Sequence, residues 1–174
     1  MPTTMTLTES APQPQADSRA GKYLSFQLGS EEFAIQVLKV REIMGLQHIT
    51  PVPHTPPEVK GVINLRGKVI PVIDLRLKFR MPEKEYGPRT CIIVVQLNHE
   101  QATQMGIIVD EVNEVATLAA ADIEDTPDFG QGIAMPYLLG MAKVKGKVKI
   151  LLDIGQVLTA HELNALHAVL QAQS

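Results

Sequence analysis

Two aspartates, Asp74 and Asp153, each follow a short aliphatic run and are the best candidates in this sequence for a pair of catalytic acids. Paired carboxylates can serve as general acid and base, or as a nucleophile, in hydrolysis. Each aspartate also stands directly before a short helical pattern, where its side chain can cap the first turn. Because both occupy the same place in an internal repeat, we interpret them as helix caps and expect no pocket that holds two carboxylates. A hydrolase remains the alternative interpretation.

The other reactive side chains form no recognisable site. The five histidines lack the two- or four-residue spacing of metal ligands. The single cysteine, Cys91, lies in an aliphatic run without a base beside it and cannot form an internal disulfide. An Asp-Phe-Gly tripeptide at 128–130 matches a kinase motif by coincidence, since no glycine-rich phosphate loop accompanies it. We therefore predict no catalytic residue, no cofactor and no metal.

Composition narrows the class of protein. The chain has 174 residues, of which 45% are hydrophobic and 20% charged, as expected for a globular protein with a sizeable core. The formal net charge is -3 and the chain has three Tyr, four Phe and no Trp, so it offers neither a strong field nor a stacking surface for nucleic acid. The longest apolar runs are far shorter than the roughly 20 residues of a membrane helix. We predict a cytoplasmic protein without nucleic-acid binding or membrane insertion.

Short β-branched runs bounded by glycine, proline or charge predict a mainly β protein. Residues 1–20 are rich in Thr, Pro, Ala, Gln and Ser and are predicted to be a disordered tail. Residues 38–44 are expected to form a helical turn, and residues 159–171 have the capping-box spacing and apolar stripe of a terminal helix. The expected strands are 23–28, 33–37, 49–52, 61–66, 69–74, 90–97, 104–110, 115–118, 139–145 and 147–153.

The second half of the chain repeats the plan of the first. Residues 33–43 align with residues 105–115, which places Glu42 on Glu114. Residues 61–75 align with residues 140–154 and share the string Gly-Lys-Val, four residues, Asp and an aliphatic. The offsets of the two alignments differ only by what a loop insertion can absorb.

Five short strands in each half favour a specific architecture. Short, twisted strands tend to close into small barrels, because closure removes exposed edges. We predict two five-stranded β-barrels packed together, the first at about 22–80 and the second at about 88–155.

Two segments are not explained by the fold alone. Residues 37–43 carry too many aliphatic side chains for a freely solvated segment, so these side chains either point into the first barrel or face a partner. Gly67 is explained by the geometry of a hairpin turn, whereas Arg66 is either plainly solvated or part of a site. If the barrel brings Glu42 and Arg66 together, they form a surface ion pair that orients a site more than it stabilises the fold.

Four lysines surround a second turn glycine, Gly146. Because they alternate, at positions 143, 145, 147 and 149, a hairpin could show all four on one face. Such lysines either guard an edge against aggregation or form an electropositive patch for an acidic partner. The patch is also the basis of an alternative from another class, a small-barrel nucleic-acid-binding protein.

The string from Asn64 to Arg76, preceded by residues 37–43 and 55–62, closely resembles the CheW family of bacterial coupling proteins. The resemblance runs from about Tyr23 to Leu166. It implies two SH3-like five-stranded barrels with short helices and a C-terminal helix, in one CheW-like domain spanning 21–174.

The resemblance also implies a function. Family members are non-enzymatic adaptors that join the cytoplasmic tip of methyl-accepting chemoreceptors to the regulatory domain of the histidine kinase CheA, in receptor arrays at the inner membrane. The groove between the barrels is expected to receive the receptor tip, and the barrel ends to meet the kinase. A non-flagellar chemosensory pathway, such as one controlling pilus motility, is the alternative. The partner-binding residues implied by the resemblance are Val37, Val40, Glu42, Ile43, Arg66 and Gly67.

Overall fold

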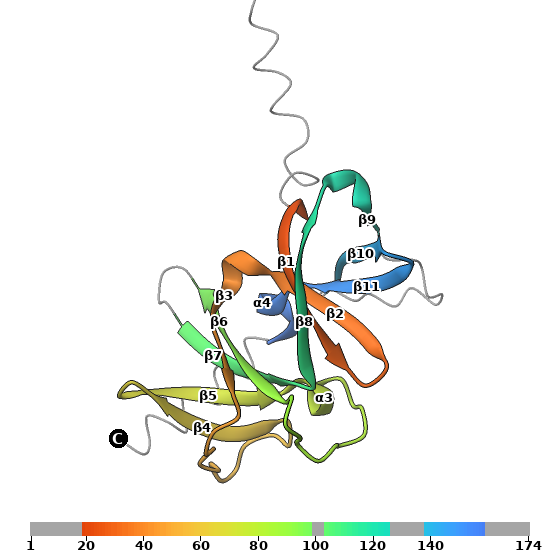
Figure 1. Ribbon diagram of the computed structural model, residues 1–174. Helices are drawn as coiled ribbons and strands as arrows, with labels where there is room; N and C mark the ends of the chain where they lie inside the picture. The colour runs from red at the N-terminus through yellow and green to blue at the C-terminus, as the bar shows by residue number, and fades with distance from the viewer. Residues whose placement is uncertain (1–18, 99–102, 126–137, 159–174) are drawn as a thin grey trace, which may run out of the picture.

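The structure, a computed structural model, describes residues 19–98, 103–125 and 138–158 and is mainly β, as predicted (Figure 1). The elements of the first half are β1 (Gly21–Leu28), β2 (Glu31–Gln36), the 3₁₀ turn η1 (Val37–Lys39), β3 (Val40–Gly45), β4 (Val59–Leu65), β5 (Lys68–Asp74) and the short helix α3 (Leu75–Lys78). Those of the second half are β6 (Cys91–Asn98), β7 (Thr103–Val109), β8 (Glu111–Leu118), η2 (Ala120–Asp122), β9 (Ile123–Glu124), β10 (Leu138–Val144), β11 (Lys147–Leu152) and α4 (Ile154–Val157).

The strands form two SH3-like barrels that exchange hairpins between the halves of the chain. The first barrel has the strand order β3-β6-β7-β5-β4, and the second has the order β8-β1-β2-β11-β10-β9. The predicted division of the chain at about 80–88 is therefore wrong, because β1–β2 joins the second barrel and β6–β7 joins the first. Alternation identifies strands and their buried faces, but not which distant strand completes a sheet. The predicted terminal helix and nearly all of the predicted tail lie outside the described residues.

The exchange preserves the internal repeat. Each half gives a hairpin to one barrel, crosses over, and gives its remaining strands to the other barrel. Parallel pairs join the halves at equivalent places: β2 runs beside β11, and β7 runs beside β5. The two barrels are thus related by the repeat, although neither is built from one continuous half.

The predicted helical turn over 38–44 is wrong beyond Lys39. The turn ends after three residues, and β3 then pairs with β6, placing Glu42 opposite Val94. Strand pairing overrides the helical spacing of the aliphatics, because β-branched residues fit a pleated, half-buried surface.

Each barrel closes through a short piece of chain that pairs with the fifth strand in its order. Thr50 exchanges two backbone hydrogen bonds of 2.9 Å with Val62 of β4, and β9 pairs in the same way with β10. The expected strand at 49–52 is reduced to this single bridge, because Pro51 has no N–H to extend the ladder.

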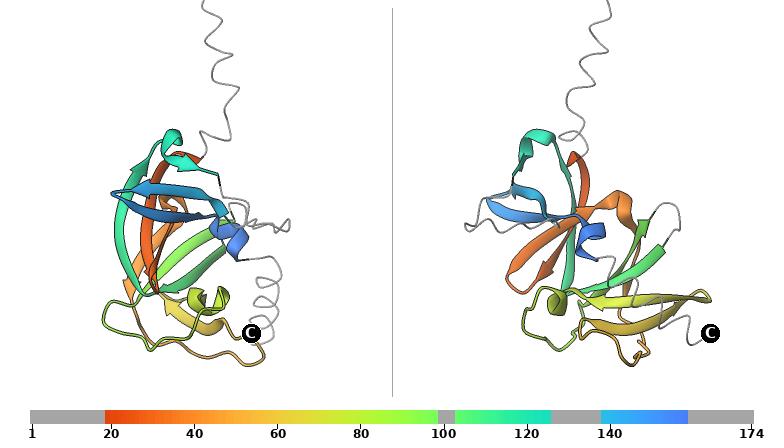
Figure 2. Two further views of the ribbon diagram at one scale, coloured as in Figure 1. Left: turned by 90° about the vertical axis from the view of Figure 1, so that its right-hand side faces the viewer. Right: turned by 180° about the vertical axis from the view of Figure 1, so that it is seen from behind.

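The largest hydrophobic cluster lies between the barrels and belongs to both. It unites Phe26 and Leu152 of the second barrel with Ile73 and Ile107 of the first. Figure 2 shows α4 between the two barrels, and its Ile154 is buried in the same cluster. Since the barrels share their main core, they form one rigid body rather than two hinged domains. None of the described helices is long and apolar enough to cross a bilayer.

Candidate partner-binding site

The turn between β4 and β5 presents the arginine that the sequence singled out. Arg66 and Gly67 adopt φ values of 53° and 86°, as the two central residues of a type I′ hairpin turn require. The Gly67 N–H donates to Asn64 Oδ1 at 2.7 Å. The Arg66 guanidinium meets both oxygens of Glu42 at 2.9 Å, and this hydrogen bonding raises the pKa of Arg66. The structure therefore contains the ion pair between Glu42 and Arg66.

Exposed aliphatic side chains lie on both elements that the ion pair connects. Ile43, beside Glu42, is 44% exposed, and Val69 of β5 is 53% exposed. Ile43 faces away from the ion pair, because Ile43 pairs with Ile93 of the shared core whereas Glu42 pairs with Val94 inside the first barrel. We call Glu42 and Arg66 the Arg66 site.

The remaining aliphatics of the 37–43 segment divide between core and surface. Val37 and Val40 are partly buried against the shared core. Leu38, between them, is 92% exposed, although no separate role was predicted for it. The three-residue turn η1 directs the Leu38 side chain away from the core that Val37 and Val40 contact. A strand with strictly alternating side chains would not predict this arrangement.

The internal repeat produces a second turn of the same design. Lys145 and Gly146 adopt φ values of 54° and 79°, and the Lys145 ammonium lies 3.8 Å from Glu114 Oε1. Val115 and Val148 are 55% and 49% exposed at the places of Ile43 and Val69. Val115 faces away from Glu114, because Val115 pairs with Leu24 of the shared core whereas Glu114 pairs with Ser25 inside the second barrel. We call Glu114 and Lys145 the Lys145 site.

The four lysines of the second hairpin do not share one face, so that expectation is wrong. Lys149 points into the second barrel, where its ammonium lies 2.8 Å from Glu114, 3.3 Å from Glu32 and 3.3 Å from Ser25 Oγ. Burial would raise the pKa of Glu32, but hydrogen bonds from Asn113 and Lys149 lower it overall. The hydrogen bond from Lys149 also lowers the pKa of Glu114. The network holds Glu114 in place for the Lys145 site.

Lys149→Ile is expected to lower the free energy of unfolding by about 2 kcal/mol, because two carboxylates lose their shared cation while remaining partly hydrated. At the equivalent position of the repeat, the first barrel has Ile70, whose side chain is buried. Adding Glu32→Gln, which copies Gln104 of the first barrel, should recover part of the loss. Urea denaturation at neutral pH measures both variants, and a single variant as stable as the original chain would contradict this role of Lys149.

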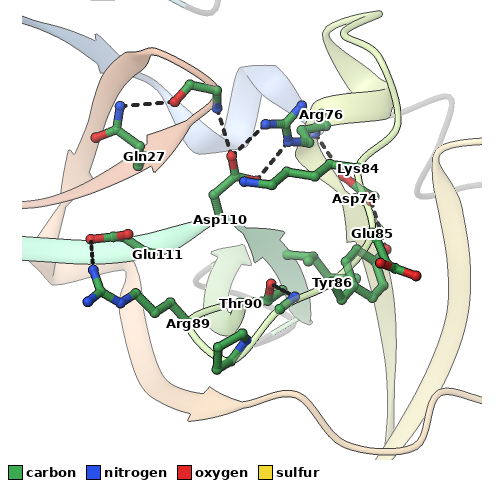
Figure 3. A pocket seen from close by; sticks show the side chains of 14 residues that line it. Gln27, Asp74, Arg76, Lys84, Glu85, Tyr86, Arg89, Thr90, Asp110 and Glu111 are labelled. Carbon is green, nitrogen blue, oxygen red and sulfur yellow. Dashed lines mark hydrogen bonds and ion pairs between the residues drawn. The ribbon is translucent and has the colours of Figure 1, made fainter.

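A cavity of about 410 Å³ contains Asp74 and Asp110, contrary to the expectation of no pocket with two carboxylates (Figure 3). All four of their oxygens accept hydrogen bonds from the protein. Asp74 accepts from the Arg76 N–H and the Tyr86 hydroxyl, and Asp110 accepts from the Arg76 guanidinium and the Gly29 N–H. Burial raises the pKa of Tyr86, and the bond to Asp74 raises it further. Both aspartates of the cavity are therefore held in structural hydrogen bonds.

The capping role predicted for the two repeated aspartates is confirmed. Asp74 caps α3 by accepting from Arg76 N at 2.9 Å, and Asp153 caps α4 by accepting from Gly155 N at 3.2 Å. Within the described ranges 19–98, 103–125 and 138–158, no three His, Cys, Asp or Glu residues are grouped to hold a metal ion.

The two crossovers between barrels differ in chemistry. Asp110 lies at the crossover from β7 to β8, where the Arg76 guanidinium grips it through two bonds of 2.7 Å. The repeat places the exposed Leu38 at the other crossover and Gly155, which has no side chain, at the place of Arg76. One crossover is thus stabilised by the ion pair of Arg76 and Asp110, which we call the Asp110 clasp, while the other presents an exposed leucine.

A model of the CheW-like domain matches residues 22–162. The chain belongs to the CheW-like domain family. A relative named chemotaxis protein CheW, from Klebsiella aerogenes, is 41% identical over 82% of this chain and 84% of its own length. The protein of the same name from Rhizobium meliloti is 34% identical over 82% of this chain and 90% of its own length.

The fold of this CheW-like domain also matches a solved structure. The crystal structure of the scaffolding protein TtCheW from Thermoanaerobacter tengcongensis superimposes with a TM-score of 0.72 and is 31% identical. The match covers 82% of this chain and 95% of TtCheW. The two-barrel architecture of this chain is therefore the architecture of a CheW-like domain.

Proposed function

We propose that this chain is a non-enzymatic scaffold of chemotaxis signalling that couples methyl-accepting receptors to the regulatory domain of the histidine kinase CheA. The observation that carries the proposal is the 41% identity to a chemotaxis protein CheW over most of both chains. The names of the relatives favour chemotaxis over a non-flagellar pathway. The burial of Lys149 weakens the nucleic-acid alternative, because it removes one of the four lysines on which that alternative rests.

The exposed groups of the fold suggest where each partner binds. Leu38 is exposed at a crossover between the barrels, and its side chain suits an apolar contact with the receptor tip. The Arg66 site, at the end of the first barrel, holds a guanidinium in a fixed position, with the exposed Val69 on the same hairpin, and suits the kinase domain. Arginine is common among the residues that dominate the energy of interfaces.

Coupling follows from two contacts on one rigid body. Small signalling interfaces are individually weak, but a receptor, an adaptor and a kinase held together raise the effective concentration of each contact. A receptor controls the kinase only if its states differ in affinity for the adaptor or the kinase. The shared core suits this role, since a rigid adaptor transmits a displacement of one partner to the other.

Arg66→Glu is expected to weaken the assembly of the kinase on receptor-containing membranes about tenfold, because it places a second carboxylate beside Glu42 at the proposed contact. The melting temperature should stay nearly unchanged, since the Arg66 side chain is exposed. Co-sedimentation of adaptor and kinase with the membranes measures assembly.

Arg80→Glu is the matched control for this experiment. Arg80 is an exposed arginine in the same half of the chain, with a φ of 60°, so its replacement makes the same change in charge and backbone preference. Equal assembly by the two variants would remove Arg66 from the site, and failure of the original chain to join kinase and receptor would refute the proposed function.

A further inference from the structure

We infer that the Asp110 clasp positions the two barrels relative to each other, so that Asp110 and Arg76 are needed for coupling although neither forms part of a partner contact. The clasp fixes the angle between the barrels, and with it the place of the receptor contact at Leu38 relative to the kinase contact at the Arg66 site. The inference rests on the proposed function, in which both contacts lie on one rigid body.

The clasp connects the barrels through three pieces of chain. Arg76 lies in α3, directly after β5 of the first barrel, and its guanidinium donates to both oxygens of Asp110 at the crossover. Asp110 also accepts from the Gly29 N–H of the β1–β2 turn at 2.7 Å, and its own N–H donates to the Gln27 carbonyl oxygen at 3.0 Å. The β1–β2 hairpin belongs to the second barrel. A continuous path of directional bonds therefore runs from one barrel to the other.

The first barrel holds its end of the clasp in place (Figure 3). The Arg76 guanidinium also donates to the Pro82 carbonyl oxygen at 2.9 Å, and the Arg76 backbone N–H donates to Asp74. Asp74 accepts in turn from the hydroxyl of Tyr86, whose ring packs against the core of the first barrel. The guanidinium is therefore supported from behind and cannot simply follow Asp110 if the barrels turn.

This joint adds a direction that the shared core does not supply. The attraction between apolar surfaces has no preferred direction, so the core holds the barrels together without setting a precise angle by itself. Two parallel bonds between a guanidinium and a carboxylate fix orientation as well as distance. Of the two crossovers, the one at Leu38 lacks such a joint, because Gly155 has the place of Arg76 in the repeat.

Burial separates this role from partner binding. The Arg76 and Asp110 side chains are 11% and 15% exposed, whereas Leu38 and Arg66 are largely exposed. An effect of the clasp on coupling must therefore pass through the relative position of the barrels. Two contacts that cannot be made at once lose the gain in effective concentration.

The first test measures the arrangement of the barrels without any partner. Figures 1 and 2 show the β4–β5 and β10–β11 hairpins at opposite ends of the molecule, so a rotation between the barrels changes the distance between them. Spin labels replace the exposed Lys68 and its repeat equivalent Lys147 in the full chain carrying Cys91→Ser. Double electron–electron resonance measures the distribution of their distance, which Asp110→Asn should broaden at least about twofold.

A second variant and a control complete this test. Arg76→Lys keeps the charge but cannot bind both oxygens, so it should also broaden the distribution, and it decides the test if Asp110→Asn does not fold. Gly140→Ala destabilises the second barrel away from the clasp, because its Cβ would lie 2.6 Å from the Glu124 carbonyl oxygen. It should leave the distribution unchanged. No broadening in the clasp variants, or equal broadening in Gly140→Ala, overturns the inference.

The second test separates coupling from binding. Asp110→Asn should bind the kinase alone with an affinity within about twofold of the original chain, because the clasp is separate from the Arg66 site. The change in kinase activity on adding receptor-containing membranes should fall about tenfold. Gly140→Ala should retain both properties. Retained control of the kinase in Asp110→Asn, or equal loss of kinase binding and control, overturns the inference, whereas failure of the original chain to bind either partner refutes the proposed function instead.

Discussion

Asp110→Asn is expected to lower the free energy of unfolding by about 3 to 5 kcal/mol, the cost of breaking a buried ion pair by removing one partner. The Arg76 and Asp110 side chains are 11% and 15% exposed. The amide is nearly the same size as the carboxylate, so the effect comes from the charge that it leaves uncompensated. Urea denaturation of the full chain at neutral pH measures the change.

Asp125→Asn supplies the matched control. Asp125 also pairs with an arginine, Arg19, at 3.1 Å, but its side chain is 90% exposed. Exposed pairs contribute little to stability, so this variant should unfold almost like the original chain. Equal losses in the two variants would contradict the structural role of the buried clasp.

The clasp also predicts a dependence on pH. Burial would raise the pKa of Asp110, but the hydrogen bonds from Arg76 and the Gly29 N–H hold it below its usual value. A carboxyl with a depressed pKa in the folded state stabilises the fold above the pKa of the unfolded chain, near about 4, and loses this contribution as the pH falls through the folded pKa. The stability difference between Asp110→Asn and the original chain should therefore be full at neutral pH and shrink below about pH 4.

Local features of the fold were predictable because local chemistry decides them. The alternation of apolar and polar residues determines strand β1, and the glycine turn at Gly67 determines the hairpin around it. Both were predicted at nearly the observed bounds. Asp74 and Asp153 cap their helices as the repeat indicated, since an aspartate before a helical turn satisfies a backbone N–H.

Pairing between distant strands was not predictable from the same patterns. The alternation in β2 predicts one buried face. That face would be the same whether the second neighbour of β2 came from its own half of the chain or, as observed, is β11 of the other half. Only packing decides between these arrangements, because the shared core forms when the hairpins exchange. The helical spacing of residues 37–44 misled for the same reason: the neighbouring strand β6 determines the conformation of β3.

The part of the candidate site that lies at the β4–β5 turn was predictable, because both the charge and the turn position of Arg66 indicated it. Glu42 and Arg66 could be proposed as a pair because one turn arginine lacked a role in the fold. The burial of Lys149 was not predictable, since an alternating lysine resembles its exposed neighbours until three polar partners converge on it. The ion pair of Asp110 with Arg76 was not predicted either, because no pattern in the sequence near Arg76 indicates a carboxylate partner 34 residues away.

Closure of the first barrel depends on a glycine that permits two backbones to approach. Gly61 has a φ of 140°, and a Cβ added there would lie 2.0 Å from the carbonyl oxygen of Thr50. Thr50 is the residue whose two hydrogen bonds to Val62 close the barrel. The second barrel repeats the arrangement: Gly140 has a φ of 153°, and its Cβ would lie 2.6 Å from the Glu124 carbonyl oxygen.

Gly61→Ala is expected to lower the free energy of unfolding by at least about 3 kcal/mol, because it combines backbone strain with a clash that must open the closing bridge. Gly21→Ala isolates the strain, since Gly21 has the same φ of 140° but no atom within 4 Å of an added Cβ. That control should lose only about 1 kcal/mol. Thermal and urea unfolding measure both variants, and hydrogen exchange at Val62 should increase in Gly61→Ala alone. Similar losses in the two variants would show that the backbone conformation, rather than the approach to Thr50, requires glycine at this place.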